Sequence, residues 1–109
     1  MREDGSVTTP PSAQPILTVV SATVSPEREA DLTDGFRDLA SGPRPDGLLR
    51  TELLRGQNGS WLIQSRWRDL ATLQAVRTSG EPPAALELFN RVGADHTHDF
   101  FFVEQSYES

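Results

Sequence analysis

The chain has 109 residues, which is the size of one domain. Its formal net charge of −6 predicts an acidic surface. Nucleic acids and anionic membranes require clustered positive charge, so the charge argues against both as partners. The sequence contains no Cys and no Lys, which excludes a thiolate nucleophile, a Schiff-base lysine, a disulfide framework and a Cys-based zinc site. It also contains no run of roughly 18 apolar residues, the length that a membrane span requires.

The N-terminal segment MREDGSVTTPPSAQP is polar and rich in Pro, Ser and Thr. Such a segment buries too little apolar surface to order itself, so residues 1–15 are predicted to be a disordered tail. The segment has no apolar stretch of the kind found in secretory signals, and we expect the protein to be cytoplasmic. The folded domain is expected to span residues 16–109.

An apolar, largely β-branched run over residues 16–24 predicts the first strand. Ser25 followed by Pro26 is typical of a helix start, with the Ser as N-cap. The helix that follows has one apolar face, and Gly42 before a proline predicts its end. That face consists of Leu32, Phe36 and Leu39.

Residues 48–55 and 60–68 are predicted to form a β-hairpin, because Asn58-Gly59 between two alternating runs is a strong hairpin signal. The alternation places every second residue of the later strand on one face. These residues are Trp61, Ile63, Ser65 and Trp67.

Asp69 is placed to cap a second helix, whose end is predicted at Gly80. A short helix over residues 84–92, a loop over 93–98 and a last strand over 99–107 follow. This order predicts an α+β, ferredoxin-like βαββαβ fold, with a four-stranded antiparallel sheet and helices on one face.

The sheet face that the helices leave open is expected to carry apolar residues among charged ones. An exposed apolar surface of this size is typical of an interface, so we expect two copies to pair through it as a homodimer. A monomer with a half-polar open sheet is the alternative. The residues expected on this face are Leu48, Arg50, Glu52, Leu54, Leu62, Gln64, Arg66 and Glu104.

On the helix-covered face, large apolar residues from the sheet and the helices converge with a few hydroxyl groups. An ordinary core and an apolar pocket for a small molecule both remain possible interpretations. In the second, the hydroxyls bind a substrate oxygen instead of satisfying backbone groups. The candidate substrate-binding residues are Phe36, Thr51, Trp61, Ile63, Ser65, Leu73 and Phe89.

Over residues 16–107 the sequence resembles the antibiotic biosynthesis monooxygenase family, within the dimeric α+β barrel superfamily. The most specific segment is a strand that ends in Trp and runs into a capped helix. The resemblance rests on Ser25-Pro26-Glu27, the helix with Phe36, Asp46-Gly47-Leu48-Leu49 and Ser65-Arg66-Trp67-Arg68-Asp69-Leu70.

The resemblance implies a small oxygenase that acts on a polycyclic aromatic polyketide or quinol. In such enzymes the electron-rich anion of the substrate itself reduces dioxygen, and the protein binds, orients and tunes a proton. The implied cofactor is none, or reduced flavin supplied from elsewhere. Trp67 matches the strand-end Trp that lines the family's pocket, so the resemblance implies a catalytic role for it beside the alternative of a core aromatic.

The sequence also departs from branches of this family. The quinone-forming and haem-degrading branches tend to place an Asn on the first strand, and residues 16–24 contain none. The haem-degrading branch places an axial His on the helix after the Trp, where this chain has Val76-Arg77-Thr78. The sequence therefore argues against haem degradation.

Three further side chains are candidates for chemistry. His96 and His98 are the only histidines and lie in the predicted polar loop, where His98 is a candidate general base. With Asp95 and Asp99 they form a possible metal-binding group, but no further ligands follow, and we expect no metal site. Arg77 either complements the dipole at its helix end or steadies a phenolate or enolate, which makes it the third catalytic candidate.

Three functions remain open from the sequence. The first is an oxygenase whose partners are an apolar aromatic substrate and dioxygen. The second is a polyketide cyclase, and the third is a binding module without catalysis, both on the same scaffold. Fold alone does not decide among them.

Overall fold

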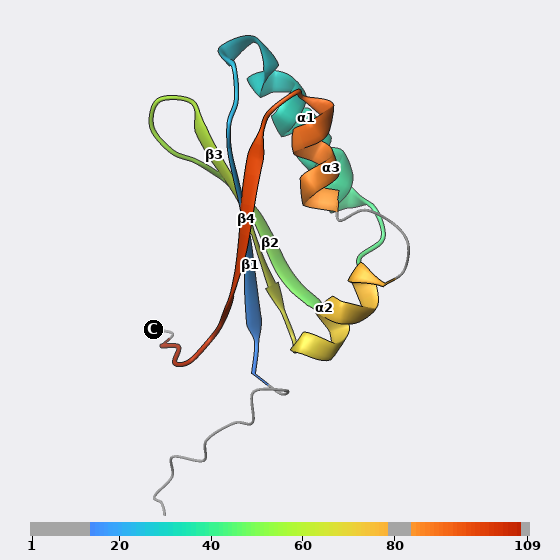
Figure 1. Cartoon of the computed structure of the whole chain (residues 1–109). Helices are drawn as coiled ribbons and strands as arrows, with labels where there is room; N and C mark the ends of the chain where they lie inside the picture. The colour runs from blue at the N-terminus through green and yellow to red at the C-terminus, as the bar shows by residue number, and fades with distance from the viewer. Residues whose placement is uncertain (1–13, 79–83, 108–109) are drawn as a thin grey trace, which may run out of the picture.

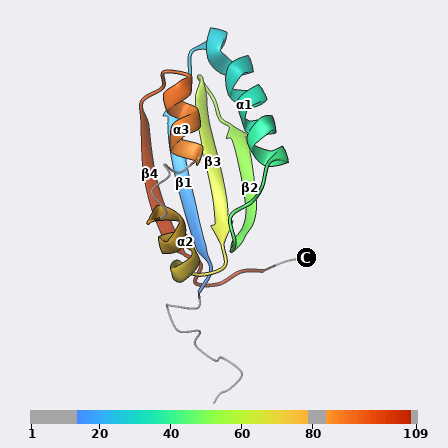
Figure 2. The same cartoon turned by 90° about the vertical axis from the view of Figure 1, so that its right-hand side faces the viewer.

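The computed structural model describes residues 14–78 and 84–107. In chain order its elements are β1 (Ile16–Thr23), the 3₁₀ turn η2 (Pro26–Arg28), α1 (Glu29–Ser41), β2 (Leu48–Arg55), β3 (Ser60–Trp67), α2 (Leu70–Arg77), α3 (Ala84–Arg91) and β4 (His96–Phe102). The four strands form one antiparallel sheet in the order β2-β3-β1-β4. All three helices cover the same face of that sheet (Figures 1 and 2). The predicted ferredoxin-like α+β fold is confirmed.

The hairpin between β2 and β3 forms where the sequence predicts it. Asn58 and Gly59 have φ values of 58° and 78°. These are the left-handed conformations that a tight hairpin turn with matching strand twist requires. The backbone N–H of Gly56 donates to the carbonyl of Ser60 at 2.7 Å and closes the turn.

The first helix begins differently from the prediction. The side chain of Ser25 makes no capping hydrogen bond, and the turn η2 precedes α1. Instead, the backbone N–H of Arg28 donates to the Ser25 carbonyl at 2.9 Å. Pro26 is the first residue of that turn, where its missing N–H costs nothing. Gly42 follows the last residue of α1, as predicted.

A β-bulge in β2 makes one of the face assignments wrong. The register shifts between Leu48 and Arg50, so Leu48 pairs with Trp67 and joins the helix-covered face. There it packs against a buried cluster instead of lying on the open face. Leu49 occupies the bulge and is 53% exposed. A bulge of this kind inserts one residue and inverts the parity of those before it.

The last strand is shifted toward the N-terminus relative to its prediction. It runs from His96 to Phe102 instead of over residues 99–107. Both histidines therefore lie in the strand β4, and their assignment to a loop is wrong. Glu104 lies beyond the strand, where its carboxylate accepts a hydrogen bond from Gln14 at 3.3 Å. The β-branched and aromatic residues that favour strands extend the pairing to β1 in both directions from Asp99.

The core on the helix-covered face consists of two clusters. The larger lies under α1 and α3, and its members are Val20, Ala22, Val24, Leu32, Trp61, Ile63, Leu88, Phe89, Val92 and Ala94. The smaller lies under α2 and contains Ile16, Trp67 and Leu73. Figures 1 and 2 show α1 and α3 together over one end of the sheet and α2 over the other.

The remaining predictions concern the two ends and one helix boundary. The predicted tail lies outside the described residues, except for Gln14 and Pro15. The second helix ends earlier than predicted, because α2 ends at Arg77 with Thr78 as its C-cap, and Gly80 itself lies outside the described residues. The Pro15 carbonyl accepts a hydrogen bond from the backbone N–H of Val103 at 2.8 Å, which places residue 15 beside the segment after β4. None of the helices in the described part of the chain is long and apolar enough to cross a membrane.

Candidate functional site

A cavity of about 150 Å³ opens between the sheet and the helices, on the helix-covered face. Its floor comes from all four strands, and its walls come from α2, the ends of α1 and α3 that face α2, and the loop between α1 and β2. The lining is mostly apolar. It consists of Thr18, Val20, Leu39, Ala40, Pro43, Arg44, Pro45, Leu48, Thr51, Ile63, Ser65, Trp67, Leu73, Val76, Arg77, Ala84, Ala85, Leu86, His98 and Asp99.

Hydroxyl groups form the polar part of the floor. The indole N–H of Trp67 on β3 donates to Oγ1 of Thr18 on β1 at 3.1 Å. Oγ of Ser65 and Oγ1 of Thr51 lie 2.9 Å apart across β3 and β2. The Thr18 hydroxyl donates its own proton to the Ser65 carbonyl at 3.5 Å. The Ser65–Thr51 pair has two protons and one hydrogen bond between its oxygens, so it retains a donor for a ligand oxygen. The floor is therefore apolar surface with a short row of hydroxyls across three strands.

The structure brings most of the predicted site residues to this cavity. The three catalytic candidates Trp67, His98 and Arg77 line it, although they come from β3, β4 and α2. Four of the predicted substrate-binding residues also contribute to the lining, namely Thr51, Ile63, Ser65 and Leu73.

The other three predicted substrate-binding residues lie elsewhere. Phe89 and Trp61 belong to the larger buried cluster, and Phe36 packs against it. The indole N–H of Trp61 donates to the carboxylate of Glu29 at 3.1 Å. The guanidinium of Arg55 lies 4.7 Å from the centre of the Trp61 ring. Trp61 therefore fixes the start of α1 to the sheet.

The two histidines have different surroundings although both lie on the helix-covered side of β4. His98 pairs with Val20 and lines the cavity. The ring of His96 lies 6.3 Å from that of Phe89, and its Nε2 is 3.0 Å from Oδ1 of Asn90 on α3. In the part of the chain that the structure describes, no three His, Asp or Glu side chains are arranged to hold a metal ion.

The guanidinium of Arg77 lies beside the cavity at the end of α2. Its central carbon is 5.5 Å from the ring centre of Phe100 on β4, a cation–π distance. Phe100 is 44% exposed, so the pair lies at the surface. The ring attracts the cation and holds it beside the cavity without supplying a hydrogen-bond acceptor to it.

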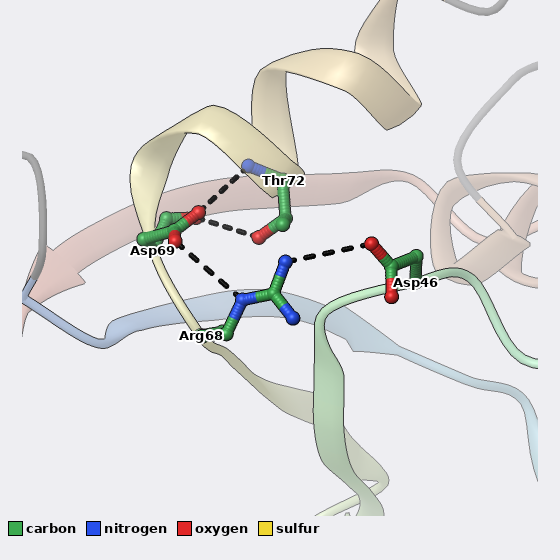
Figure 3. Close-up of polar contacts among 4 residues, drawn as sticks. All are labelled: Asp46, Arg68, Asp69 and Thr72. Carbon is green, nitrogen blue, oxygen red and sulfur yellow. Dashed lines mark hydrogen bonds and ion pairs between the residues drawn. The ribbon is translucent and has the colours of Figure 1, made fainter.

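A polar network holds two walls of the cavity together (Figure 3). Oδ1 of Asp69 accepts the backbone N–H of Thr72 at 2.9 Å, the predicted N-cap of α2. The guanidinium of Arg68 forms two ion pairs. Its Nε lies 3.5 Å from Oδ2 of Asp69, and its Nη2 lies 3.4 Å from Oδ2 of Asp46, a residue of the loop before β2. The hydrogen bond from the Thr72 backbone, with smaller contributions from the Thr72 hydroxyl and Arg68, lowers the pKa of Asp69 below its ordinary value.

Gly47 brings that loop into contact with α2. Its φ is 87°, and a Cβ added there would lie 2.4 Å from Cβ of Thr72. Its carbonyl accepts the backbone N–H of Arg68 at 2.8 Å. Only a glycine tolerates both the conformation and the close approach. The loop and α2 are therefore fixed relative to each other at one end of the cavity.

The sequence interpretation missed several lining residues. Thr18 lies two residues from both Ile16 and Val20 on β1, so strand alternation places it on the same, helix-covered face. The alternation of this strand could therefore have identified it as a lining residue. Arg44 lies in a loop rich in Pro and Gly, where no periodicity indicates a direction. Leu48 was assigned to the other face because a bulge has no clear sequence signal.

A family model described as antibiotic biosynthesis monooxygenase matches residues 15–88, more than half of the chain. The chain belongs to the antibiotic biosynthesis monooxygenase family. No curated protein sequence matches it significantly.

Solved structures of several other proteins share the fold. A variant of SnoaB, a cofactor-independent oxygenase from Streptomyces nogalater, has a TM-score of 0.68 at 25% identity, covering 89% of this chain and all of SnoaB. A Deinococcus radiodurans protein assigned as an antibiotic biosynthesis monooxygenase has a TM-score of 0.68 at 14% identity, over 86% of this chain and 97% of its own. A Caulobacter crescentus protein with the same assignment reaches 0.65 at 16% identity, over 88% and 93%. These identities establish the fold and leave the substrate open.

Proposed function

We propose that this protein is a monooxygenase that oxidises an electron-rich polycyclic aromatic compound, such as a polyketide phenol or quinol, with dioxygen and without metal or haem. The observation that carries the proposal is the apolar cavity with hydroxyl groups and Trp67 on its floor. Family membership and the likeness to a cofactor-independent oxygenase support the reaction type.

The size of the cavity suits part of a polycyclic compound. A cavity of about 150 Å³ is the size that holds a single benzene ring when its walls are apolar. One ring therefore enters, and the rest of the substrate lies across the opening. The reacting ring is the inserted one, because the apolar walls exclude water from it and the hydroxyls meet its oxygen.

The chemistry begins with the loss of a proton from the bound phenol or anthrone. The resulting anion transfers an electron to dioxygen, and a carbon–oxygen bond forms between the two radicals. For an anthrone, the ring CH₂ becomes a carbonyl and the second oxygen atom leaves as water. No external reductant enters this balance, since the substrate supplies the electrons.

Each catalytic candidate has a place in this scheme. His98 accepts the substrate proton at the edge of the cavity, and the positive charge of Arg77 at the opening favours an anionic substrate. Trp67 donates its N–H to Thr18, so its ring contributes apolar surface to the site and no hydrogen-bond donor.

We further propose that two copies pair through the open face of the sheet. Phe101 and Leu54 are 54% and 41% exposed and lie on or beside that face, together with the half-buried Leu62 and Leu17. Burying them against a second sheet removes this apolar surface from water. Sedimentation velocity at micromolar concentration should give the mass of two chains.

The test of the oxygenase is dioxygen uptake with an anthrone, measured with and without reduced flavin. We expect enzyme-dependent uptake that needs no flavin and falls at least about tenfold in Trp67→Phe. The matched control is Trp61→Phe, because Trp61 lies on the same face of the same strand but belongs to the closed cluster. Binding without uptake overturns the oxygenase. Ring closure with loss of water then identifies a cyclase, and binding alone identifies a binding module.

A further inference from the structure

The arginines in the described part of the chain divide into two groups by their partners. Most lie within 3.9 Å of a carboxylate oxygen, namely Arg28, Arg37, Arg50, Arg55, Arg68 and Arg91. Among the described residues, Arg44, Arg66 and Arg77 have no such ion pair. The absence is informative in a chain with 16 acidic and 10 basic residues, where carboxylates outnumber the available cations.

Two of these three arginines line the same cavity. Arg44 comes from the loop between α1 and β2, and Arg77 comes from the end of α2, so they reach the cavity from different walls. Both side chains are exposed, whereas Trp67 and Ser65 on the floor are buried. The two charges therefore lie at the opening and the hydroxyls lie deeper.

Among the described lining residues, the only acidic one does not neutralise them. Asp99 pairs with Val19, and Val19 alternates with Thr18 and Val20 of the helix-covered face. The register thus places Asp99 on the open side of the sheet. The central guanidinium carbon of Arg77 lies 5.5 Å from the ring centre of Phe100, and Arg77 has no ion pair among the described residues, so its N–H groups are available to an anion.

We propose that the substrate is an aromatic carboxylate, one ring of which enters the cavity while its carboxylate binds Arg44 and Arg77 at the opening. This deepens the proposed function and rests on it for the identity of the site. A guanidinium matches a carboxylate through paired N–H groups, and the attraction is strongest beside an apolar wall that displaces water. The same arrangement places the reacting ring away from the carboxylate, against the hydroxyls and Trp67.

The test compares two probes of equal shape, 2-naphthoate and 2-naphthamide, by isothermal titration calorimetry at low ionic strength. We expect the carboxylate to bind on the order of tenfold more tightly than the amide. Arg44→Gln and Arg77→Gln should each weaken naphthoate binding several-fold and leave naphthamide binding unchanged. Added salt should reduce the preference, because the arginines are exposed.

Arg37→Gln is the control, since Arg37 is exposed on α1, outside both the cavity lining and the open face of the sheet. Its naphthoate affinity should equal that of the wild type. Equal affinity of the two probes, no binding of either, or an equal loss in Arg37→Gln overturns the proposal. Thermal unfolding of each variant verifies that the fold is intact.

The outcome is separable from that of the oxygenase proposal. A carboxylate preference that depends on both arginines supports this inference even when no anthrone supports dioxygen uptake. Uptake from anthrones combined with equal binding of both naphthalene probes leaves the oxygenase standing and overturns the carboxylate site alone.

Discussion

Two regions on the same face of one sheet differ in how completely they are filled. Under α1 and α3 the side chains close into a continuous cluster in which Leu32 and Phe89 are fully buried. Beside α2 a single helix covers the sheet, the buried cluster has three members, and a cavity remains. A small domain buries little apolar surface, so a cavity lowers its free energy of unfolding by a significant amount. Burial in the closed region offsets this loss. The difference separates the part that stabilises the fold from the part available to a ligand.

The two tryptophans of β3 lie in these two regions, one in the closed cluster and one at the cavity. Trp61 and Trp67 lie on the same face, six positions apart, and both are buried. Trp61 donates to Glu29 and fixes α1, whereas Trp67 donates to Thr18 on the floor of the cavity. Identical residues with the same parity thus have different surroundings.

The largest expected effect is on stability, and it distinguishes the two regions. Phe89→Ala removes a fully buried ring from the closed cluster and should lower the free energy of unfolding by about 4 kcal/mol. Leu73→Ala should cost about 2 kcal/mol, because Leu73 already borders a cavity and loses fewer contacts. Urea unfolding measures both. Equal losses would show that the two regions are packed alike.

The next effect concerns the wall that Gly47 and Thr72 hold in place. Gly47→Ala should cost about 3 kcal/mol, from its positive φ and the overlap with Thr72 together. Gly93→Ala is the control, because its φ of 71° is comparable and nothing lies within 4 Å of the added Cβ. That variant should cost about 1 kcal/mol. Ligand affinity should change in Gly47→Ala only. An equal change in both variants would contradict a specific role of the Gly47 loop in shaping the cavity.

The smallest effect is the pH dependence that Asp69 contributes. Its pKa is lowered in the folded state, so its carboxylate stabilises the fold above the ordinary value of 3.8 and loses that effect as the pH falls below it. Asp69→Asn keeps a side-chain oxygen that can cap α2 but cannot titrate. Thermal unfolding from pH 6 to pH 2.5 should show a shallower decline for this variant than for the wild type. Parallel curves would contradict a lowered pKa.

Much of the fold was predictable because its signals are local. The Asn58-Gly59 turn, the cap at Asp69 and the end of α1 at Gly42 each depend on the conformation of a few neighbouring residues. Strand alternation also assigned Trp61 and Trp67 to the helix-covered face correctly.

The errors arose where tertiary pairing overrides a local pattern. The bulge after Leu48 places this residue on the sheet face opposite to the predicted one. Pairing with β1 makes His96 and His98 part of the strand β4 instead of a loop. The site was predictable only in part for the same reason. Which tryptophan borders a cavity depends on where α2 ends relative to α1 and α3, and no periodicity of β3 contains that information.

The most direct test of the central claim uses the two indole N–H signals, since the chain contains two Trp. The claim is that the region beside α2 binds aromatic ligands and the region under α1 and α3 does not. In a ¹H–¹⁵N NMR titration with 2-naphthol, assigned through Trp61→Phe and Trp67→Phe, the Trp67 signal should shift progressively and saturate while the Trp61 signal stays in place. A shift of Trp61 equal to or larger than that of Trp67, or no saturable shift of either, would contradict the account.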